Sequence, residues 1–84
     1  MEVEFNFNGI KTVLHCNIND KMKNIFEEYT LKIGKKIELL YMIYDSNIIN
    51  EELMEKTYYQ TANNIDKKRK IMNILVYLKN SKLS

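Results

Sequence analysis

The sequence predicts an α+β domain in which a mixed sheet of four to five strands packs on one amphipathic helix at about residues 20–33. Residues 1–16 alternate apolar and polar side chains on either side of an Asn-Gly pair, which is the pattern of a β-hairpin. Residues 22–33 then repeat apolar side chains at the spacing of one helical face. Because an apolar helix face and an apolar sheet face need each other, we expect a single domain over residues 1–84.

The turn of the first hairpin predicts its register. Asn8 and Gly9 tolerate the positive φ angles of a two-residue type I′ turn, which fixes the pairing of the two strands. Since strand side chains alternate, one face of the ribbon is expected to be buried and almost wholly apolar. Its pairs are Met1 with Cys16, Val3 with Leu14, Phe5 with Thr12 and Phe7 with Ile10. The solvated face pairs Glu2 with His15, Glu4 with Val13 and Asn6 with Lys11.

The helix carries start and stop signals. Asn19 or Asp20 is the expected N-cap, because a short polar side chain can accept a hydrogen bond from an N–H of the first turn. Gly34 is the expected C-cap, since glycine adopts the left-handed conformation easily. The stripe expected to face the sheet consists of Met22, Ile25, Phe26, Tyr29 and Ile33. Leu31 points almost directly away from it.

The second half contains two further strand regions. Residues 39–44 are rich in strand formers, and Asp45-Ser46-Asn47 supplies turn chemistry before a short returning strand at Ile48 and Ile49. Residues 71–78 form the strongest strand, and apolar residues on both faces predict that it is central or carries a binding surface. Met72, Ile74 and Val76 share one face, whereas Ile71, Asn73, Leu75 and Tyr77 share the other.

Residues 50–65 mix helical and loop signals. Four of their side chains are large enough to close the edge of the core. These are Leu53, Tyr58, Tyr59 and Ile65.

Charge is distributed unevenly along the chain. Residues 1–66 contain seven basic and eleven acidic side chains, whereas residues 67–84 contain six basic side chains and no acidic one. The basic run consists of Lys67, Lys68, Arg69 and Lys70. Such clustering can mark a surface for nucleic acid or an acidic partner. A run before a strand is more often a solvated turn, so nucleic-acid binding is the less favoured alternative.

The sequence lacks the patterns of a catalytic or metal site. His15 and Cys16 are neighbours on a strand, so their side chains point to opposite sides and cannot form a dyad. Cys16 is instead expected to pack as a small hydrophobe. Asp45 and the Glu51-Glu52 pair lack metal-ligand spacing, and no glycine-rich phosphate loop occurs. We therefore expect no enzyme activity, no metal and no cofactor.

Composition predicts a globular intracellular protein. The hydrophobic content is 45%, and no apolar run approaches the roughly 18 residues that span a bilayer. Glu2 and Glu4 interrupt the region where a secretory signal would be apolar. We expect a monomer in the cytoplasm, the nucleus or both, without membrane contact.

In this order of elements, the chain resembles a ubiquitin-like domain, whose fold is the β-grasp. Each matching motif is short, and the inference rests on their order and spacing over nearly the whole chain. The matches are Gly9-Ile10-Lys11-Thr12, then Asp20 with Met22 and Ile25, Met42-Ile43-Tyr44 with Ile49, and Met72-Asn73-Ile74-Leu75-Val76. The last segment resembles the closing Leu-His-Leu-Val-Leu of the family.

The resemblance implies a non-enzymatic protein-interaction module. Ubiquitin binds partners through an apolar patch on the open face of its sheet, where Ile43 would take the place of the central isoleucine, Leu75 of the valine and Asn73 of the histidine. Tyr77 shares that face. The short turn at residues 8–9 leaves no counterpart for the leucine of ubiquitin's longer first loop. The implied partners are receptors of the ubiquitin-pathway type or processing factors.

The end of the sequence departs from the family. Modifiers of this family are attached through a terminal diglycine, whereas residues 77–84 read YLKNSKLS, and Asn47 replaces the most used acceptor lysine. One hypothesis is a module that is part of, or excised from, a larger precursor. The alternative is a modifier conjugated after precursor or intein-like processing, as in protist polyubiquitin-like precursors. The reading frame beyond Ser84 would distinguish them.

Overall fold

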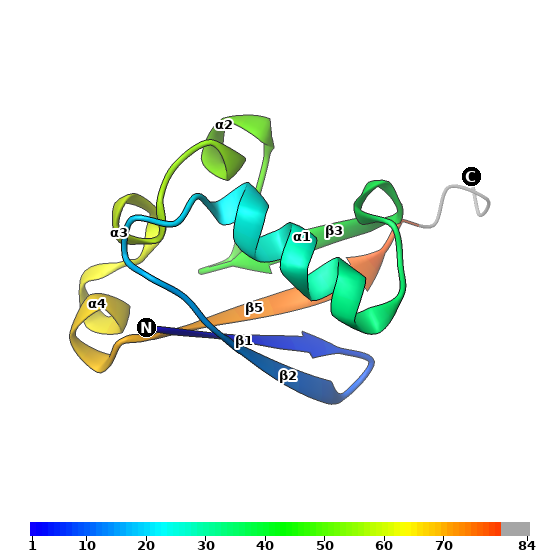
Figure 1. The fold of residues 1–84 in the computed structure, drawn as a ribbon, viewed down its shortest axis with the longest axis horizontal. Helices are drawn as coiled ribbons and strands as arrows, with labels where there is room; N and C mark the ends of the chain where they lie inside the picture. Colours follow the sequence, from blue (N-terminus) through cyan, green and yellow to red (C-terminus); the bar gives the residue numbers. More distant parts are fainter. Residues whose placement is uncertain (80–84) are drawn as a thin grey trace.

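A computed structural model describes residues 1–79 and shows one sheet with a helix lying across one of its faces (Figure 1). The strands are β1 (Glu2–Phe7), β2 (Ile10–His15), β3 (Leu40–Tyr44), β4 (Asn47–Ile48) and β5 (Ile71–Leu78). Their order is β2-β1-β5-β3-β4, and among these described strands only β1 and β5 pair in parallel. The predicted mixed sheet is therefore confirmed with five strands, and β5 is central.

The helices differ greatly in length. The long one is α1 (Met22–Ile33), with twelve residues. The short ones are the 3-10 helix η1 (Ile37–Leu39), α2 (Glu51–Met54), α3 (Tyr58–Thr61) and α4 (Asn64–Arg69). Within residues 1–79, none is long and apolar enough to cross a membrane.

The first hairpin has the predicted register throughout. Asn8 and Gly9 adopt φ angles of 53° and 80°, which is the geometry that a type I′ turn requires. Val3, Phe5 and Leu14 are buried as expected. The prediction that Ile10 is buried is wrong, because Ile10 lies at the hairpin tip on the edge strand β2, where its side chain is exposed.

Helix α1 begins at Met22, and the prediction that Asn19 or Asp20 caps it is wrong. The carboxylate of Asp20 instead accepts a hydrogen bond from the Asn17 N–H at 2.9 Å. The Met22 N–H donates to the Lys56 carbonyl at 2.8 Å. A backbone group far away in the sequence therefore satisfies the start of the helix.

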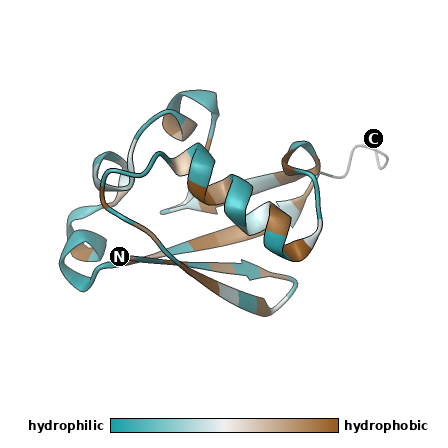
Figure 2. Ribbon diagram, in the orientation of Figure 1, coloured by the Kyte–Doolittle hydropathy of each residue, from teal (hydrophilic) through white to brown (hydrophobic). Residues whose placement is uncertain are grey.

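The predicted stripe of α1 packs on the inner face of the sheet. Met22, Ile25, Phe26 and Tyr29 are buried, and Ile33 is half-buried against the same core. The ring of Phe5 stacks on Tyr29 with centroids 4.0 Å apart. Figure 2 shows that apolar residues recur along α1 and alternate with polar ones along the strands.

The second hairpin and the short helices depart from the sequence-based expectations in detail. Asp45 and Ser46 both have positive φ, so the turn has two residues and the returning strand begins at residue 47 instead of 48. In α3, only Tyr58 points inward and is fully buried, because a single turn offers one side to the core. The predictions that Tyr59 and Ile65 close the core are wrong, since both are exposed.

Gly34 ends α1 in the left-handed conformation, with φ 72°. The Gly34 N–H donates to the Leu31 carbonyl and the Lys35 N–H to the Thr30 carbonyl, which is a Schellman motif. Among residues 1–79, no heavy atom beyond the two chain neighbours lies within 4 Å of a Cβ added at Gly34, so Gly34→Ala would add only backbone strain.

We expect Gly34→Ala to lower the free energy of unfolding by about 1 kcal/mol, measured by urea denaturation. Gly34→Asn is the control and should lose less stability than Gly34→Ala, because asparagine tolerates the left-handed conformation better than alanine does. An alanine variant as stable as the parent would contradict the strain argument.

The buried Tyr58 predicts a loss of stability at alkaline pH. Its hydroxyl donates to the Glu2 carbonyl at 3.1 Å, and burial, followed by nearby acidic groups, raises the pKa of Tyr58 to about 12. The folded state therefore favours the protonated phenol, so this stabilisation is complete below about pH 10, the pKa of a free tyrosine, and is lost as pH rises toward 12.

We expect urea denaturation between pH 9 and 12 to show a falling free energy of unfolding, with a smaller fall in Tyr58→Phe. Tyr77→Phe removes an exposed phenol and should retain the full fall. Equal pH dependence in Tyr58→Phe and the parent would contradict the assignment.

Candidate functional site

Within the part of the chain that the structure describes, α1 covers the inner face of the sheet and leaves the outer face open (Figure 1). Along β5 the structure places Met72, Ile74 and Val76 in the core, as predicted. The intervening residues therefore point outward, since strand side chains alternate. Their exposure increases along the strand, from Ile71, which is half-buried, to Asn73, Leu75 and Tyr77, which are exposed.

Apolar side chains from three neighbouring strands meet on this open face. Ile43 lies opposite Leu75, and Tyr41 lies opposite Tyr77 with ring centroids 5.7 Å apart. On the side of β3 away from β5, Ile48 of β4 lies opposite Ile43. Leu75 and Tyr77 are 45% and 46% exposed. We call Tyr41, Ile43, Ile48, Leu75 and Tyr77 the sheet patch.

The sequence-predicted residues Ile43, Leu75 and Tyr77 thus come together, and Asn73 lies at the margin of the sheet patch beside β1. Sequence reasoning missed Tyr41 and Ile48. Tyr41 lies two residues before Ile43, so strand alternation was a signal for it. Ile48 could be placed only once the length of the turn before β4 was known.

The other half of the open face is mainly polar, with Val13 as an exposed apolar side chain between Lys11 and His15. Glu4 and Asn6 point outward from β1 next to β5. The Lys11 Nζ lies 3.7 Å from a carboxylate oxygen of Glu4, and the His15 Nδ1 lies 3.7 Å from one of Glu2. Single exposed apolar side chains are ordinary on proteins, but a contiguous apolar group with a polar border is typical of a binding surface.

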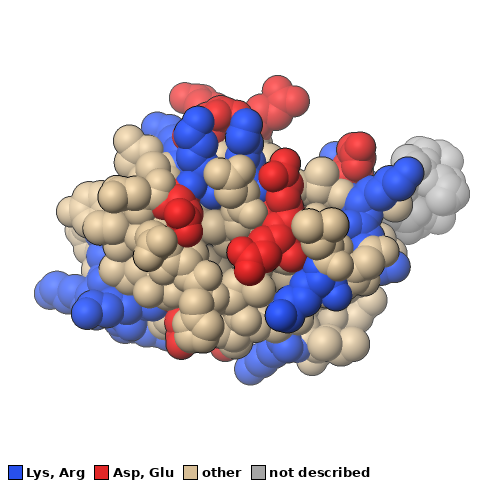
Figure 3. All heavy atoms as spheres, viewed as in Figure 1, with Lys and Arg blue, Asp and Glu red and all other residues tan. Residues whose placement is uncertain are grey.

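The basic run lies at the C-terminal end of α4, whereas the sequence led us to expect a solvated turn before β5. Lys67, Lys68 and Arg69 occupy the last turn of α4, and Lys70 ends it in the left-handed conformation, with φ 64°. Basic side chains at a helix C-terminus interact favourably with the helix dipole. Figure 3 shows Lys and Arg side chains gathered at the end of the molecule where α4 lies.

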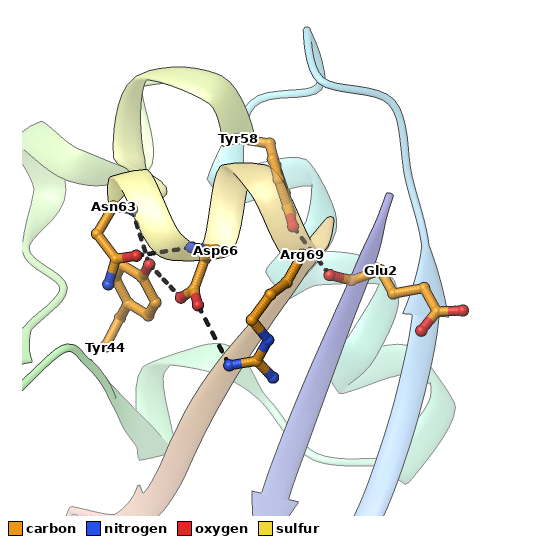
Figure 4. Close-up of polar contacts among 6 residues, drawn as sticks. All are labelled: Glu2, Tyr44, Tyr58, Asn63, Asp66 and Arg69. Atoms are coloured by element: carbon orange, nitrogen blue, oxygen red, sulfur yellow. Dashed lines mark hydrogen bonds and ion pairs between the residues drawn. The ribbon is translucent and has the colours of Figure 1, made fainter.

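A buried polar network fixes α4 to β3 (Figure 4). The Tyr44 hydroxyl donates to Asp66 Oδ2 at 2.5 Å and accepts from the Asn63 N–H at 2.9 Å. Arg69 Nη1 lies 3.8 Å from the other carboxylate oxygen of Asp66. Burial, and then the Asp66 carboxylate, raise the pKa of Tyr44 far above its usual range, so this hydroxyl keeps its proton.

Cys16 has the environment of a structural thiol. It is half-buried against the core, and burial raises the pKa of the thiol to about 11. A thiol that stays protonated at neutral pH is a poor nucleophile. His15 points to the opposite, open face. Within residues 1–79, no group of three His, Cys, Asp or Glu side chains is placed to hold a metal ion.

Two buried tyrosines provide a matched test of the network. Tyr44→Phe would leave the Asp66 carboxylate and the Asn63 N–H without their partner, and we expect it to lower the free energy of unfolding by about 1–3 kcal/mol. The Tyr29 hydroxyl has no hydrogen-bond partner among residues 1–79, so Tyr29→Phe should leave stability unchanged or raise it. Urea denaturation measures both, and equal losses would contradict this assignment.

Comparison with known proteins identifies the architecture. No protein-family model and no curated protein matches the sequence. Among solved structures, the solution NMR structure of a ubiquitin-like domain from Arabidopsis thaliana superimposes with a TM-score of 0.74 at 10% identity, covering 94% of this chain and 77% of that one. A second structure of the same plant protein, determined from evolutionary couplings and sparse NMR data, gives 0.73 at 10% identity, with coverage of 94% and 86%. The chain therefore has the ubiquitin-like β-grasp fold.

Proposed function

We propose that this domain is a non-enzymatic protein-interaction module that binds its partners through the sheet patch. The observation that carries the proposal is the contiguity of the patch. Five apolar side chains from three adjacent strands occupy one region of the face that α1 leaves open. Their partners would be receptors of the type that recognises ubiquitin, or processing factors of a precursor.

The residue types of the sheet patch suit reversible binding. Tyr41 and Tyr77 offer large apolar rings with a polar tip, and aromatic side chains of this kind are enriched where proteins meet. Burying a leucine or isoleucine side chain contributes about 1.5–3 kcal/mol. Because Ile43 is already half-buried, Leu75 and Ile48 have more surface left to bury. The sheet patch has five side chains, whereas each partner in a standard interface contributes roughly 20–30 residues. A patch this small favours weak and exchangeable partners over a permanent complex.

The polar half of the open face would orient the partner. Glu2 and Glu4 lie on β1, the strand that pairs directly with β5. Charges at the border of an interface mainly influence the association rate and the choice of partner. The modifier hypothesis depends on the chemistry of the chain after Lys79, which lies outside the described residues, so the interaction role is the function we propose.

The proposal is tested by titrating the isotope-labelled protein with a panel of helical ubiquitin-binding domains and following backbone amide shifts by NMR. We expect the shifts to map to β3, β4 and β5. Leu75→Ser should weaken binding about tenfold, equivalent to roughly 1.4 kcal/mol, because it removes an exposed apolar contact without touching the core.

Leu31→Ser is the matched control, because Leu31 is 82% exposed on α1, outside the sheet patch. It should bind like the parent. Shifts that map to α1, equal loss of affinity in both variants, or no binding to any member of the panel would refute the proposal.

A further inference from the structure

We propose that the end of the domain formed by α3 and α4 is a second interaction surface, which takes a short acidic peptide segment carrying an apolar side chain. The surface consists of Tyr59, Ile65, Lys67, Lys68 and Lys70, and we call it the α4 surface. It is separate from the sheet patch, and the inference does not depend on the proposed function.

The apolar centre of the α4 surface is present because Asp66 points inward. Asp66 is buried by its contact with Tyr44, so its neighbour Ile65 faces outward and is 67% exposed. Lys68 lies three residues after Ile65, on the same side of the helix. An exposed isoleucine therefore lies next to an exposed lysine.

Tyr59 extends the α4 surface on the side of α4 away from Ile65, because its partner Lys67 comes two residues after Ile65. Tyr59 is 54% exposed, and the Lys67 ammonium lies 4.1 Å from the centroid of its ring. A cation over an aromatic face is an attractive contact that holds both side chains in place. This contact links α3 to α4 on the outside of the molecule.

Within residues 1–79, no ion pair compensates the lysines of the α4 surface. The nearest acid in the sequence, Asp66, is engaged by Tyr44 and Arg69. Within residues 1–79, no carboxylate oxygen lies within 4.0 Å of the ammonium groups of Lys67, Lys68 or Lys70. Elsewhere lysines do have such partners, for example Lys21 and Lys23, which share Glu55. Lys68 beside Ile65, with Lys67 and Lys70 at the same helix end, complements carboxylates beside an apolar side chain.

The geometry favours an acidic peptide over a nucleic acid. Helix α4 has six residues, so at 1.5 Å per residue it is only about 9 Å long and offers a short track for phosphates. Toward the sheet, Lys70 is followed by β5, which lies beside Glu2 and Glu4. A polyphosphate backbone that continued in this direction would meet carboxylates. Lys67 also occupies one face of the Tyr59 ring, where a base would stack.

The α4 surface and the sheet patch lie toward opposite ends of β5. The α4 surface ends at Lys70, directly before β5, whereas the sheet patch uses Leu75 and Tyr77 in the second half of β5. A variant of one surface can therefore leave the other intact, so the two proposals can fail separately.

The test uses fluorescence anisotropy with a labelled peptide in which one leucine is flanked by glutamates. The same peptide with glutamines and a labelled oligothymidine are the comparison probes. We expect the acidic peptide to bind and both comparison probes to bind more weakly. Lys68→Gln and Ile65→Ser should each weaken peptide binding about tenfold. Binding should also weaken as the salt concentration rises above about 0.15 M.

Lys32→Gln is the control for charge, because it removes the same charge from the exposed side of α1. Leu75→Ser is the control for the sheet patch. Both should bind the acidic peptide like the parent, and circular dichroism should show that every variant is folded. No binding of the acidic peptide, an equal loss in Lys32→Gln and Lys68→Gln, or tighter binding of oligothymidine that Lys68→Gln weakens would overturn the proposal.

Discussion

The structure depends on the alternation of side chains along the central strand β5. Met72, Ile74 and Val76 enter the core, while Leu75 and Tyr77 between and after them reach the open face. Parallel pairing with β1 and antiparallel pairing with β3 fix this register from both sides. A slip by one residue would exchange the two faces, so the same pairing that builds the core also presents the sheet patch.

Covering the sheet on one side only allows stability and the proposed binding to depend on different residues. Stacking of Phe5 on Tyr29 and the inward stripe of α1 bury the inner face. Within residues 1–79 the outer face has no such cover, so its apolar side chains are not required for the core. Leu75 and Tyr77 can therefore change with little effect on folding, as is usual for surface substitutions.

Local signals in the sequence predicted the parts of the fold that local chemistry determines. Asn8-Gly9 predicted the first register, and period-two alternation predicted both faces of β5. Prediction failed where a contact with a residue distant in the sequence determines how a segment starts or which way its side chains point. The start of α1 is satisfied by the Lys56 carbonyl, and Asp66 is drawn inward by Tyr44, twenty-two residues earlier. That second contact turns Ile65 outward, which no pattern in residues 50–65 indicates.

Two adjacent residues of β3 position both proposed surfaces. Ile43 and Tyr44 are adjacent on β3 and therefore point to opposite faces, Ile43 to the sheet patch and Tyr44 to the Asp66 contact that orients α4. Rigid attachment of this kind fixes the distance between two sites, but it does not couple their affinities. Coupling requires two states for which a ligand has different affinities. A fully bonded Tyr44 hydroxyl favours one arrangement, so the two surfaces should bind independently while holding two partner segments in a fixed relation.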